Sequence, residues 1–266
     1  MNDESATSPT GIIGRLAIAT GFLTRLPVPG ALFPAPPLPL AQAADAFALA
    51  GVIAALIPAF VLLAASMLGM PDLVSAVLAI AALAIVTGGL HEDGLADCGD
   101  GLAGYHEREK RLEIMRDSRI GAHGAVTLVL VLLLRVAALS AILAHAGGLG
   151  SAAILLGVAA ASRAGMALFW FATPSARHEG LSASAGMPQK TAALRAQLIG
   201  LAILIVTALP FAPAGSLLIG LSFAALALYA LRRVCLRQIG GQTGDVLGAA
   251  QLLAECALLC GLAIGG

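Results

Sequence analysis

Long runs of apolar residues alternate with short polar segments along this chain. Seven runs approach or exceed the about 20 residues that a transmembrane helix requires. Gly and Ala are abundant within these runs, as is usual where helices pack closely in a bilayer. The pattern predicts an all-α fold, a polytopic integral membrane bundle that forms a single domain over residues 1–266. The seven expected spans are residues 44–69, 73–90, 122–146, 149–172, 193–212, 214–231 and 245–264.

A shorter apolar segment, residues 11–26, precedes the first span. As a helix it would be about 24 Å long, which is short for a membrane crossing. It carries Arg15 and Arg25, and a proline-rich connector follows it. We therefore expect an interfacial or re-entrant helix. Residues 1–10 form a polar tail that lacks the positive region of a secretory signal.

The composition agrees with a membrane protein. Hydrophobic residues make up 59% of the chain and charged residues only 11%, whereas soluble domains have about 25% charged residues. Fifteen basic residues balance fifteen acidic ones, so the basic excess of a nucleic-acid-binding protein is absent. These values exclude a soluble globular protein, a disordered chain and a nucleic-acid binder. The four cysteines lack zinc-ligand spacing and imply no disulfide framework.

The basic residues are distributed unevenly between the two sides of the predicted bundle. Thirteen of the fifteen lie in the N-terminal helix or in the segments 91–121, 173–195 and 232–244. The positive-inside rule makes this face cytoplasmic. The polar chemistry therefore gathers at one membrane surface, whereas a transporter often places polar groups at the midplane.

An acidic cluster follows the second span, in the sequence TGGLHEDGLADCGDGLAG at 87–104. On a helix, Asp93, Asp97 and Asp100 would lie within a sector of about 60°. Three carboxylates on one stripe repel each other, and a hard divalent cation such as Mg²⁺ prefers oxygen ligands and often bridges to phosphates. We expect these three residues to bind Mg²⁺. The alternative is an acidic, solvated loop.

A basic stretch, REKRLEIMRDSR, follows at 108–119. Arginine suits bidentate contacts with phosphate. We expect Arg116, Ser118 and Arg119 to contact substrate, and Asp117 to act as a further metal ligand or as the general base. Arg108, Lys110 and Arg111 are better explained as residues that fix the topology. Acids and bases on one face suggest a Mg²⁺-dependent reaction on a phosphorylated substrate.

At these residues the chain resembles the cobalamin 5'-phosphate synthases, also called adenosylcobinamide-GDP ribazoletransferases. The resemblance covers nearly the whole chain. Cys98, Gly99 and His123 depart from the family's usual residues, but these departures remove no acidic residue. The matching segments are FLTRLPVP at 22–29, GGLHEDGLADCGDG at 88–101, LEIMRDSRIGAHG at 112–124, the pair Ser162 and Arg163, ARHEGL at 176–181, and GGQTGDVLGAAQLLAE at 240–255.

The resemblance implies a Mg²⁺-dependent transferase of the bacterial inner membrane whose active site faces the cytoplasm. Its substrates would be adenosylcobinamide-GDP and α-ribazole or α-ribazole 5'-phosphate. The ribazole 3'-hydroxyl would attack the phosphorus nearest the cobinamide, giving adenosylcobalamin or its 5'-phosphate and GMP. Asp97, Asp100 and Asp117 would be the catalytic residues. The expected partner is the lipid bilayer. Two further partners are left open: other cobalamin-assembly enzymes and a second copy of the chain.

Further candidates for substrate contact lie throughout the matching segments. Some have a structural alternative: Thr243 and Asp245 could cap the last span, and Arg163 could form a buried ion pair, with Glu255 as a partner for it or for Arg135. Trp170 lies at a span end, where an aromatic belt explains it. The candidates are Arg25, His91, His123, Arg163, Arg177, Glu179, Thr243 and Asp245.

Three other functions remain as alternatives at this point. An ion-coupled transporter would bind cations through its acidic residues, near the midplane. A non-catalytic scaffold of the cobalamin pathway would not need three aspartates in register. A lipid head-group phosphotransferase would share the chemistry but not the full set of motifs.

Overall fold

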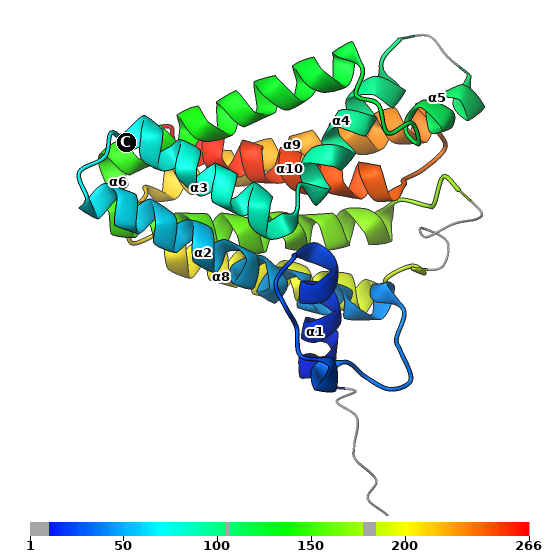
Figure 1. Ribbon diagram of the computed structural model, residues 1–266, viewed down its shortest axis with the longest axis horizontal. Coiled ribbons are helices and arrows are strands. Elements are labelled where there is room, and N and C mark those ends of the chain that lie inside the picture. Colours follow the sequence, from blue (N-terminus) through cyan, green and yellow to red (C-terminus); the bar gives the residue numbers. More distant parts are fainter. Residues whose placement is uncertain (1–10, 105–106, 178–184, 266) are drawn as a thin grey trace, which may run out of the picture.

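The computed structural model describes residues 11–104, 107–177 and 185–265. Within these ranges the chain is helical, and its one isolated bridge joins Ser175 to Gln242. Most of the long helices run side by side along the longest axis of the molecule (Figure 1). They are α2 (Phe47–Met67), α3 (Asp72–Thr87), α6 (Ala122–Ala172), α8 (Lys190–Ala208), α9 (Ala214–Gln238) and α10 (Gly244–Leu262).

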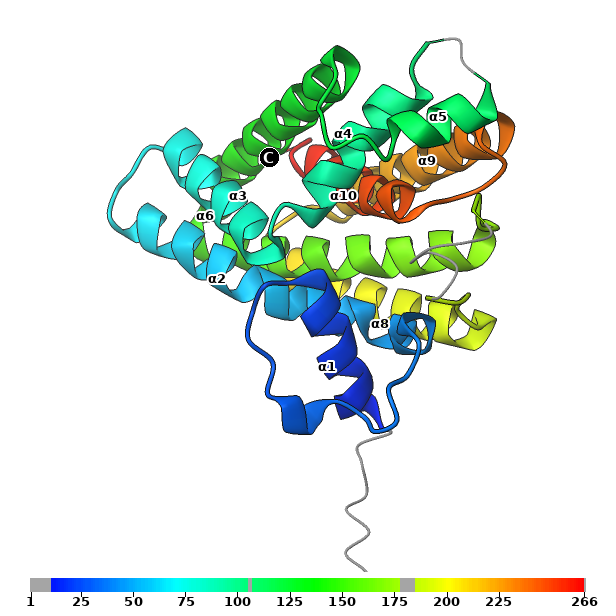
Figure 2. The ribbon, with the colours of Figure 1, turned by 45° about the vertical axis from the view of Figure 1, so that its right-hand side comes forward.

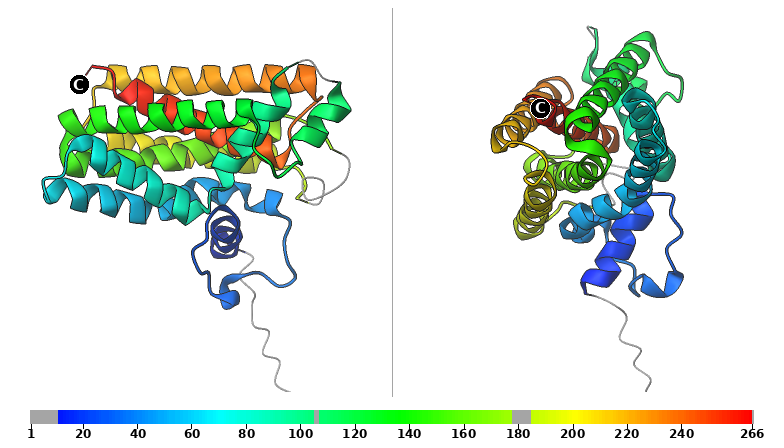
Figure 3. Two further views of the ribbon diagram at one scale, coloured as in Figure 1. Left: turned by 45° about the horizontal axis from the view of Figure 1, so that its top comes forward. Right: turned by 90° about the vertical axis from the view of Figure 1, so that its left-hand side faces the viewer.

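Helix α6 is a hairpin of two helical arms. Gly147 interrupts it with φ 67° and ψ 177°, a backbone conformation that glycine adopts readily because it has no Cβ. The arms, residues 122–146 and 148–172, run in opposite directions (Figure 3, left). They correspond to two of the predicted spans, so the break between those spans is confirmed.

The number of spans follows from this hairpin. Among the described residues, five helices are long and apolar enough to cross a membrane, or six if α3 and the helix after it form one bent span. This count takes α6 once. Counting its two arms separately brings the larger total to seven, the number expected from the hydrophobic pattern. The outer surface is apolar, with Phe60, Leu68 and Leu133 each more than half exposed, as suits helices that face lipid.

Helix α1 (Ile12–Leu23) lies across the direction of the bundle (Figure 2). It packs on the 3-10 helix η2 (Leu40–Ala46) and on α2, and Arg15 Nε lies 2.9 Å from Asp45 Oδ1. A second 3-10 turn, η1 (Gly30–Leu32), lies in the connector between them. A short apolar helix with this orientation fits the expected interfacial helix better than a further span.

A sharp bend separates α3 from α4 (Leu90–Leu102). The two helices meet at 91°, and the bend is made by Gly88 and Gly89, with φ 66° and 69°. Helix α4 thus leaves the direction of α3 and packs against α6 and α10. It lies at the end of the bundle that also carries α5 (Arg108–Ile114) and the start of α10 (Figure 1). The polar segments expected on one face therefore lie together.

Candidate active site

Helix α4 carries the acidic cluster and crosses the start of α10 at close range. A Cβ added at Gly94 would lie 2.7 Å from the carbonyl oxygen of Asp245, and one at Gly248 would lie 3.4 Å from the Cα of His91. Glycine at these two positions lets the two backbones approach. As a result Asp93 and Asp97 of α4 lie beside Asp245 of α10, although about 150 residues separate them along the chain.

The negative charge on the carboxyl of Asp97 is unfavourable, because the group is partly buried and other carboxylates lie near it. Its pKa is raised to about 7, first by partial burial and then by the negative charges of Asp93, Asp245 and Asp100, while Arg177 opposes the shift. Asp93, Asp97 and Asp245 are called the Asp97 group below. A half-buried set of carboxylates that holds a proton near neutral pH marks a place where positive charge would be favourable.

Asp245 is held in place at the first turn of α10. Thr243 Oγ1 donates a hydrogen bond of 3.0 Å to Asp245 Oδ2 and accepts one of 3.3 Å from the backbone N–H of Val246. Thr243 is therefore the N-cap of this helix, which confirms the capping interpretation. Arg177 Nη2 lies 3.9 Å from Asp245 Oδ2, and partial burial lowers the pKa of this guanidinium.

Asp100 points away from the Asp97 group, toward the start of α6. Its two oxygens accept hydrogen bonds of 2.7 and 2.8 Å from the backbone N–H groups of Gly121 and Gly124. These N–H groups belong to the unpaired first turn of a helix, whose dipole also favours a negative charge. Asp100 therefore anchors α6 to α4. A role in metal binding would require this carboxylate to share its oxygens.

In the part of the chain that the structure describes, the predicted Mg²⁺ site is not present as a preformed cage, but its residues have the right chemistry. Within the described ranges, no three His, Cys, Asp or Glu side chains are grouped so that they could hold a metal ion. The oxygen-only character and the mutual repulsion of the Asp97 group nevertheless fit a hard cation. Mg²⁺ keeps several waters and commonly binds through one or two carboxylates plus substrate phosphate, so a preformed three-residue cage is not needed.

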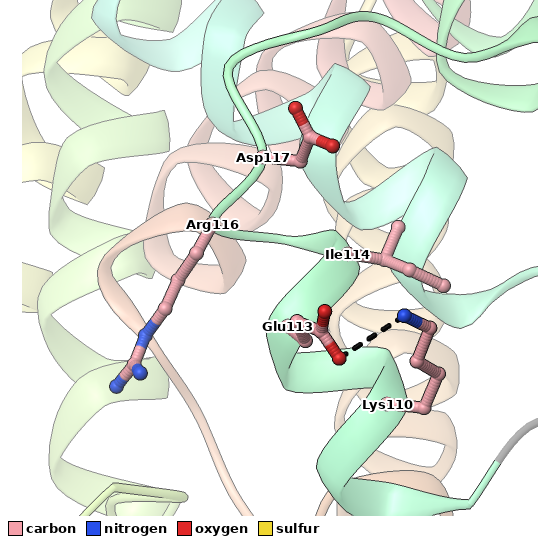
Figure 4. A pocket seen from close by; sticks show the side chains of 5 residues that line it. All are labelled: Lys110, Glu113, Ile114, Arg116 and Asp117. Carbon is pink, nitrogen blue, oxygen red and sulfur yellow. Dashed lines mark hydrogen bonds and ion pairs between the residues drawn. The ribbon is translucent and has the colours of Figure 1, made fainter.

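Asp117 belongs to a separate, exposed arrangement. Arg119 Nη2 donates to Asp117 Oδ2 at 2.6 Å, and the backbone and Nε of Arg119 donate to Oδ1 at 3.1 and 3.0 Å. These hydrogen bonds lower the pKa of Asp117 to about 2. A shallow hollow of about 300 Å³ beside it is lined by Lys110, Glu113, Ile114, Arg116 and Asp117 (Figure 4).

The other expected contact residues lie in different surroundings. Arg116, Ser118 and His123 are exposed. Arg25 is also exposed and lies across Gly88 at the bend before α4, where an added Cβ would meet its side chain. Glu179 lies outside the described residues.

Two basic residues of α5 donate hydrogen bonds to the segments that connect the helices at this end of the bundle. Arg108 Nε donates to the carbonyl oxygen of Ile239 at 2.9 Å, and its Nη2 donates to that of Ala176 at 2.6 Å. Arg111 Nη2 donates to the carbonyl oxygen of Gly104 at 2.8 Å. These contacts join the segments before α6, α8 and α10, which supports the structural interpretation of Arg108 and Arg111.

A buried ion network lies between α4, both arms of α6 and α10. Arg135 Nη1 lies 3.0 Å from Glu92 Oε1, its Nε donates to Glu255 Oε1 at 3.1 Å, and Arg163 Nη1 lies 3.7 Å from Glu255 Oε2. Gln251 Nε2 also donates to Glu255 Oε2 at 2.8 Å. Glu255 is thus the partner of both arginines, and Arg163 lies in a fully buried ion pair.

An apolar cavity of about 460 Å³ opens beside the Asp97 group. His91, Asp93 and Asp245 line part of it. Trp170 lies in its wall and is only 2% exposed, so the aromatic-belt interpretation of this residue is wrong. The rest of the lining is Phe22, Leu23, Leu40, Phe47, Leu90, Gly94, Met166, Ala185, Gly244, Leu247 and Gly248.

Comparisons with known proteins agree with the resemblance in the motifs. The family model described as Cobalamin-5-phosphate synthase matches residues 15–263. The chain belongs to this family. A protein of Brucella ovis named adenosylcobinamide-GDP ribazoletransferase is 44% identical over 95% of this chain and 97% of its own length. One of Brucella anthropi with the same name is 45% identical over 94% and 96%. No solved structure matches the chain.

The match to the cobalamin-5-phosphate synthase family includes every residue of the Asp97 group and of the ion network. Sequence reasoning found Asp93, Asp97 and Asp245 but did not place Asp245 in the same group. It missed the cavity, whose aromatic residues come from separate helices. The only signal in the sequence was the presence of Trp170, the one tryptophan of the chain.

Proposed function

We propose that this protein transfers the adenosylcobinamide-phosphate group from adenosylcobinamide-GDP to α-ribazole or α-ribazole 5'-phosphate. The proposal is supported by the family and by the names of relatives that share about 44% of their residues over nearly the whole chain. The observation in the structure that carries it is the Asp97 group, whose repelling carboxylates lie at the polar end of a membrane bundle.

The reaction exchanges the phosphoanhydride bond of the donor for a new phosphoester bond. The 3'-hydroxyl oxygen of ribazole bonds to the phosphorus nearest the cobinamide, and the bond from that phosphorus to the bridging oxygen breaks, so GMP leaves with that oxygen. The hydroxyl proton must also leave. We assign its acceptance to a carboxylate of the Asp97 group, the acidic residues that lie together at this end of the bundle. Asp117 is a poorer acceptor, because Arg119 already holds it and its pKa is about 2.

Mg²⁺ would be held by oxygens of the Asp97 group. When bound, it would neutralise charge on the diphosphate and on the leaving GMP. The residues themselves position this chemistry: Thr243 fixes Asp245, and the close crossing of α4 and α10 fixes Asp93 and Asp97.

The active site is proposed to face the cytoplasm from the bacterial inner membrane. The support is the uneven charge distribution together with the fold. The basic segments that flank α5 and precede α10 lie at one end of the bundle, which is also the end that carries the Asp97 group (Figure 1). A transporter would place its carboxylates deeper, along the spans.

The test uses the full chain in liposomes with adenosylcobinamide-GDP and α-ribazole, in Mg²⁺ or in EDTA. GMP and the corrinoid product are followed by chromatography. Asp97→Asn is compared with Asp72→Asn, an exposed aspartate in the first turn of α3. We expect Mg²⁺-dependent GMP release that is lost in Asp97→Asn and retained in Asp72→Asn.

Folded wild-type protein that releases no GMP would contradict the transferase. Equal GMP release in Mg²⁺ and in EDTA would contradict the requirement for Mg²⁺ but not the transferase activity. Product formed from diacylglycerol or inositol acceptors in place of ribazole would point to a lipid head-group phosphotransferase.

A further inference from the structure

The apolar cavity beside the Asp97 group is built from parts of the chain that lie far apart. Its walls come from α1, η2, the start of α2, α4, the second arm of α6 and the start of α10. Phe47 and Trp170 stack within it, with ring centroids 6.1 Å apart and planes inclined by 28°. An apolar pocket with a few convergent polar groups is the usual form of a small-molecule site.

Two buried polar atoms on the cavity wall lack partners. Trp170 and His91 are each 2% exposed, and neither Trp170 Nε1 nor His91 Nε2 has a hydrogen-bond partner among the described residues. Leaving a buried donor unpaired costs free energy, and most buried polar side-chain atoms in proteins are paired. Both residues line the same cavity, so a small turn of either side chain would let a ligand held there pair with its polar atom.

The size of the cavity selects among the parts of the two substrates. At about 460 Å³, it is in the range of sites for drug-sized molecules, about 300–1,000 Å³. A corrin macrocycle with its amide side chains is several times larger than a two-ring base and would not fit. The candidates that remain are the base of ribazole and the guanine of the donor.

The chemistry of the walls separates these two bases. Guanine has several donors and acceptors along its edges, and each would need a partner. The base of ribazole is 5,6-dimethylbenzimidazole, which has two fused aromatic rings, two methyl groups and one free acceptor nitrogen. Phe47, Met166 and Leu247 suit the rings and methyl groups, and Trp170 offers one N–H donor.

We propose that this cavity binds the dimethylbenzimidazole base of the ribazole acceptor, stacked against Trp170 and Phe47, with Trp170 Nε1–H donating to the free ring nitrogen. The inference rests on the proposed function and assigns one subsite of it. With the base in the cavity, the ribose lies toward the edge formed by Asp93 and Asp245. The 3'-hydroxyl is then presented to the Asp97 group, where the transfer takes place.

The single tryptophan makes the binding directly measurable. The full chain in detergent or liposomes is titrated with 5,6-dimethylbenzimidazole and with α-ribazole, without donor, and Trp170 fluorescence is recorded with excitation at the red edge of its absorption. We expect a saturable change with both ligands and none with GMP or GDP. A saturable change with the guanine nucleotides but not with the benzimidazoles would overturn the assignment.

A variant that fills the cavity gives a second, kinetic readout. Ala185 is a half-buried lining residue in a turn, so Ala185→Phe adds bulk without disturbing a helix. The matched control is Ala263→Phe, a half-buried alanine at the far end of α10. We expect Ala185→Phe to raise the KM for α-ribazole about ten-fold or more, with the KM for adenosylcobinamide-GDP unchanged and no effect of Ala263→Phe.

If Ala185→Phe raised only the KM for adenosylcobinamide-GDP, the cavity would be assigned to the donor instead of the acceptor. The proposed subsite would be contradicted if folded Ala185→Phe had an unchanged KM for α-ribazole and if Trp170 fluorescence of the wild type did not respond to the benzimidazoles. Either result can be obtained while the wild type still releases GMP from both substrates. The failure of this subsite is therefore distinct from the failure of the proposed function.

Discussion

Two sets of charged residues share α4 and α10 but differ in balance. Glu92 of α4 and Glu255 of α10 face two arginines of α6 in the buried ion network. Asp93, one residue away from Glu92, belongs to the Asp97 group. Among the described residues, the one ion pair of this group is that of Asp245 with Arg177, at 3.9 Å. Neighbouring positions on one helix thus serve opposite purposes. The ion network balances its own charges, and we propose that the unbalanced Asp97 group takes up a cation or a substrate.

The physical basis of this difference is the free energy needed to bury a charged group away from water. A charge that is buried without a partner is strongly unfavourable, so the network contains two acids and two bases that neutralise each other. The Asp97 group is only partly buried, and it keeps a proton near neutral pH instead of acquiring a full set of basic partners. Its repulsion is the reason that ligand binding can be favourable there.

The largest effect is expected where the unbalanced set is altered. Asp97→Asn removes the central carboxylate, and we expect kcat for GMP release to fall about 10²- to 10⁴-fold because positive charge and the hydroxyl proton lose their acceptor. The folded state should survive, since a repelling charge is removed. Steady-state kinetics and thermal unfolding of the same preparation check both parts. A variant that is active but unfolds early would reverse the roles of the two sets.

The balanced set should respond in the opposite way. Glu255→Gln leaves Arg163 without an acidic partner within the described residues, and breaking a buried pair costs about 3–5 kcal/mol. We expect an unfolding midpoint in detergent well below that of the wild type. Glu113→Gln is the control, because Glu113 forms an exposed pair with Lys110, worth about 0–1 kcal/mol. Equal midpoints for the two variants would contradict a structural role for the network.

A smaller effect is the pH dependence that Asp97 gives to stability. Its pKa is about 7 in the folded protein and about 4 when unfolded, so the folded state binds the proton more tightly. Without divalent cation, the contribution of Asp97 becomes unfavourable as the pH rises from about 4 to about 7 and is constant above that. After allowance for solvent screening we expect about 1 kcal/mol.

The measurement is the difference in unfolding midpoint between Asp97→Asn and the wild type. In EDTA the variant should be the more stable protein at pH 8, and the difference should vanish toward pH 4. Added Mg²⁺ should stabilise the wild type more than the variant. A difference that is independent of pH would show that Asp97 does not titrate in this range.

The smallest effect is expected at the exposed aspartate. Asp117 is paired with Arg119 at the surface, away from the Asp97 group, and its pKa is far below neutral. We therefore expect Asp117→Asn to lower kcat less than about ten-fold, below the range for a general base. A loss as large as that of Asp97→Asn would return the role of general base to Asp117.

The spans could be predicted because the hydrophobic pattern determines them. The predicted boundary near residues 146–149 coincides with Gly147, and the acidic stripe lies on one helix, α4, as its spacing required. Membrane helices must pair their backbone groups internally, so a long apolar run has few alternatives to a helix.

The partners of the acidic residues could not be predicted in the same way. Asp100 turns to the first turn of α6, and Asp245 joins Asp97 because glycines allow α4 to lie against α10. These contacts depend on the 91° bend at Gly88 and Gly89 and on how far apart two helix axes lie, which local periodicity does not contain. The cavity depends in addition on the position of α1.

The ion network also bears on how the protein is made. Arg135 and Arg163 are synthesised and enter the bilayer before Glu255, which lies in α10 and pairs with both. In the finished fold Arg135 also contacts Glu92, and Arg163 donates to the carbonyl oxygen of Ala159 at 3.1 Å. Since both arginines share Glu255, the charges of the buried network balance only in a chain that includes α10.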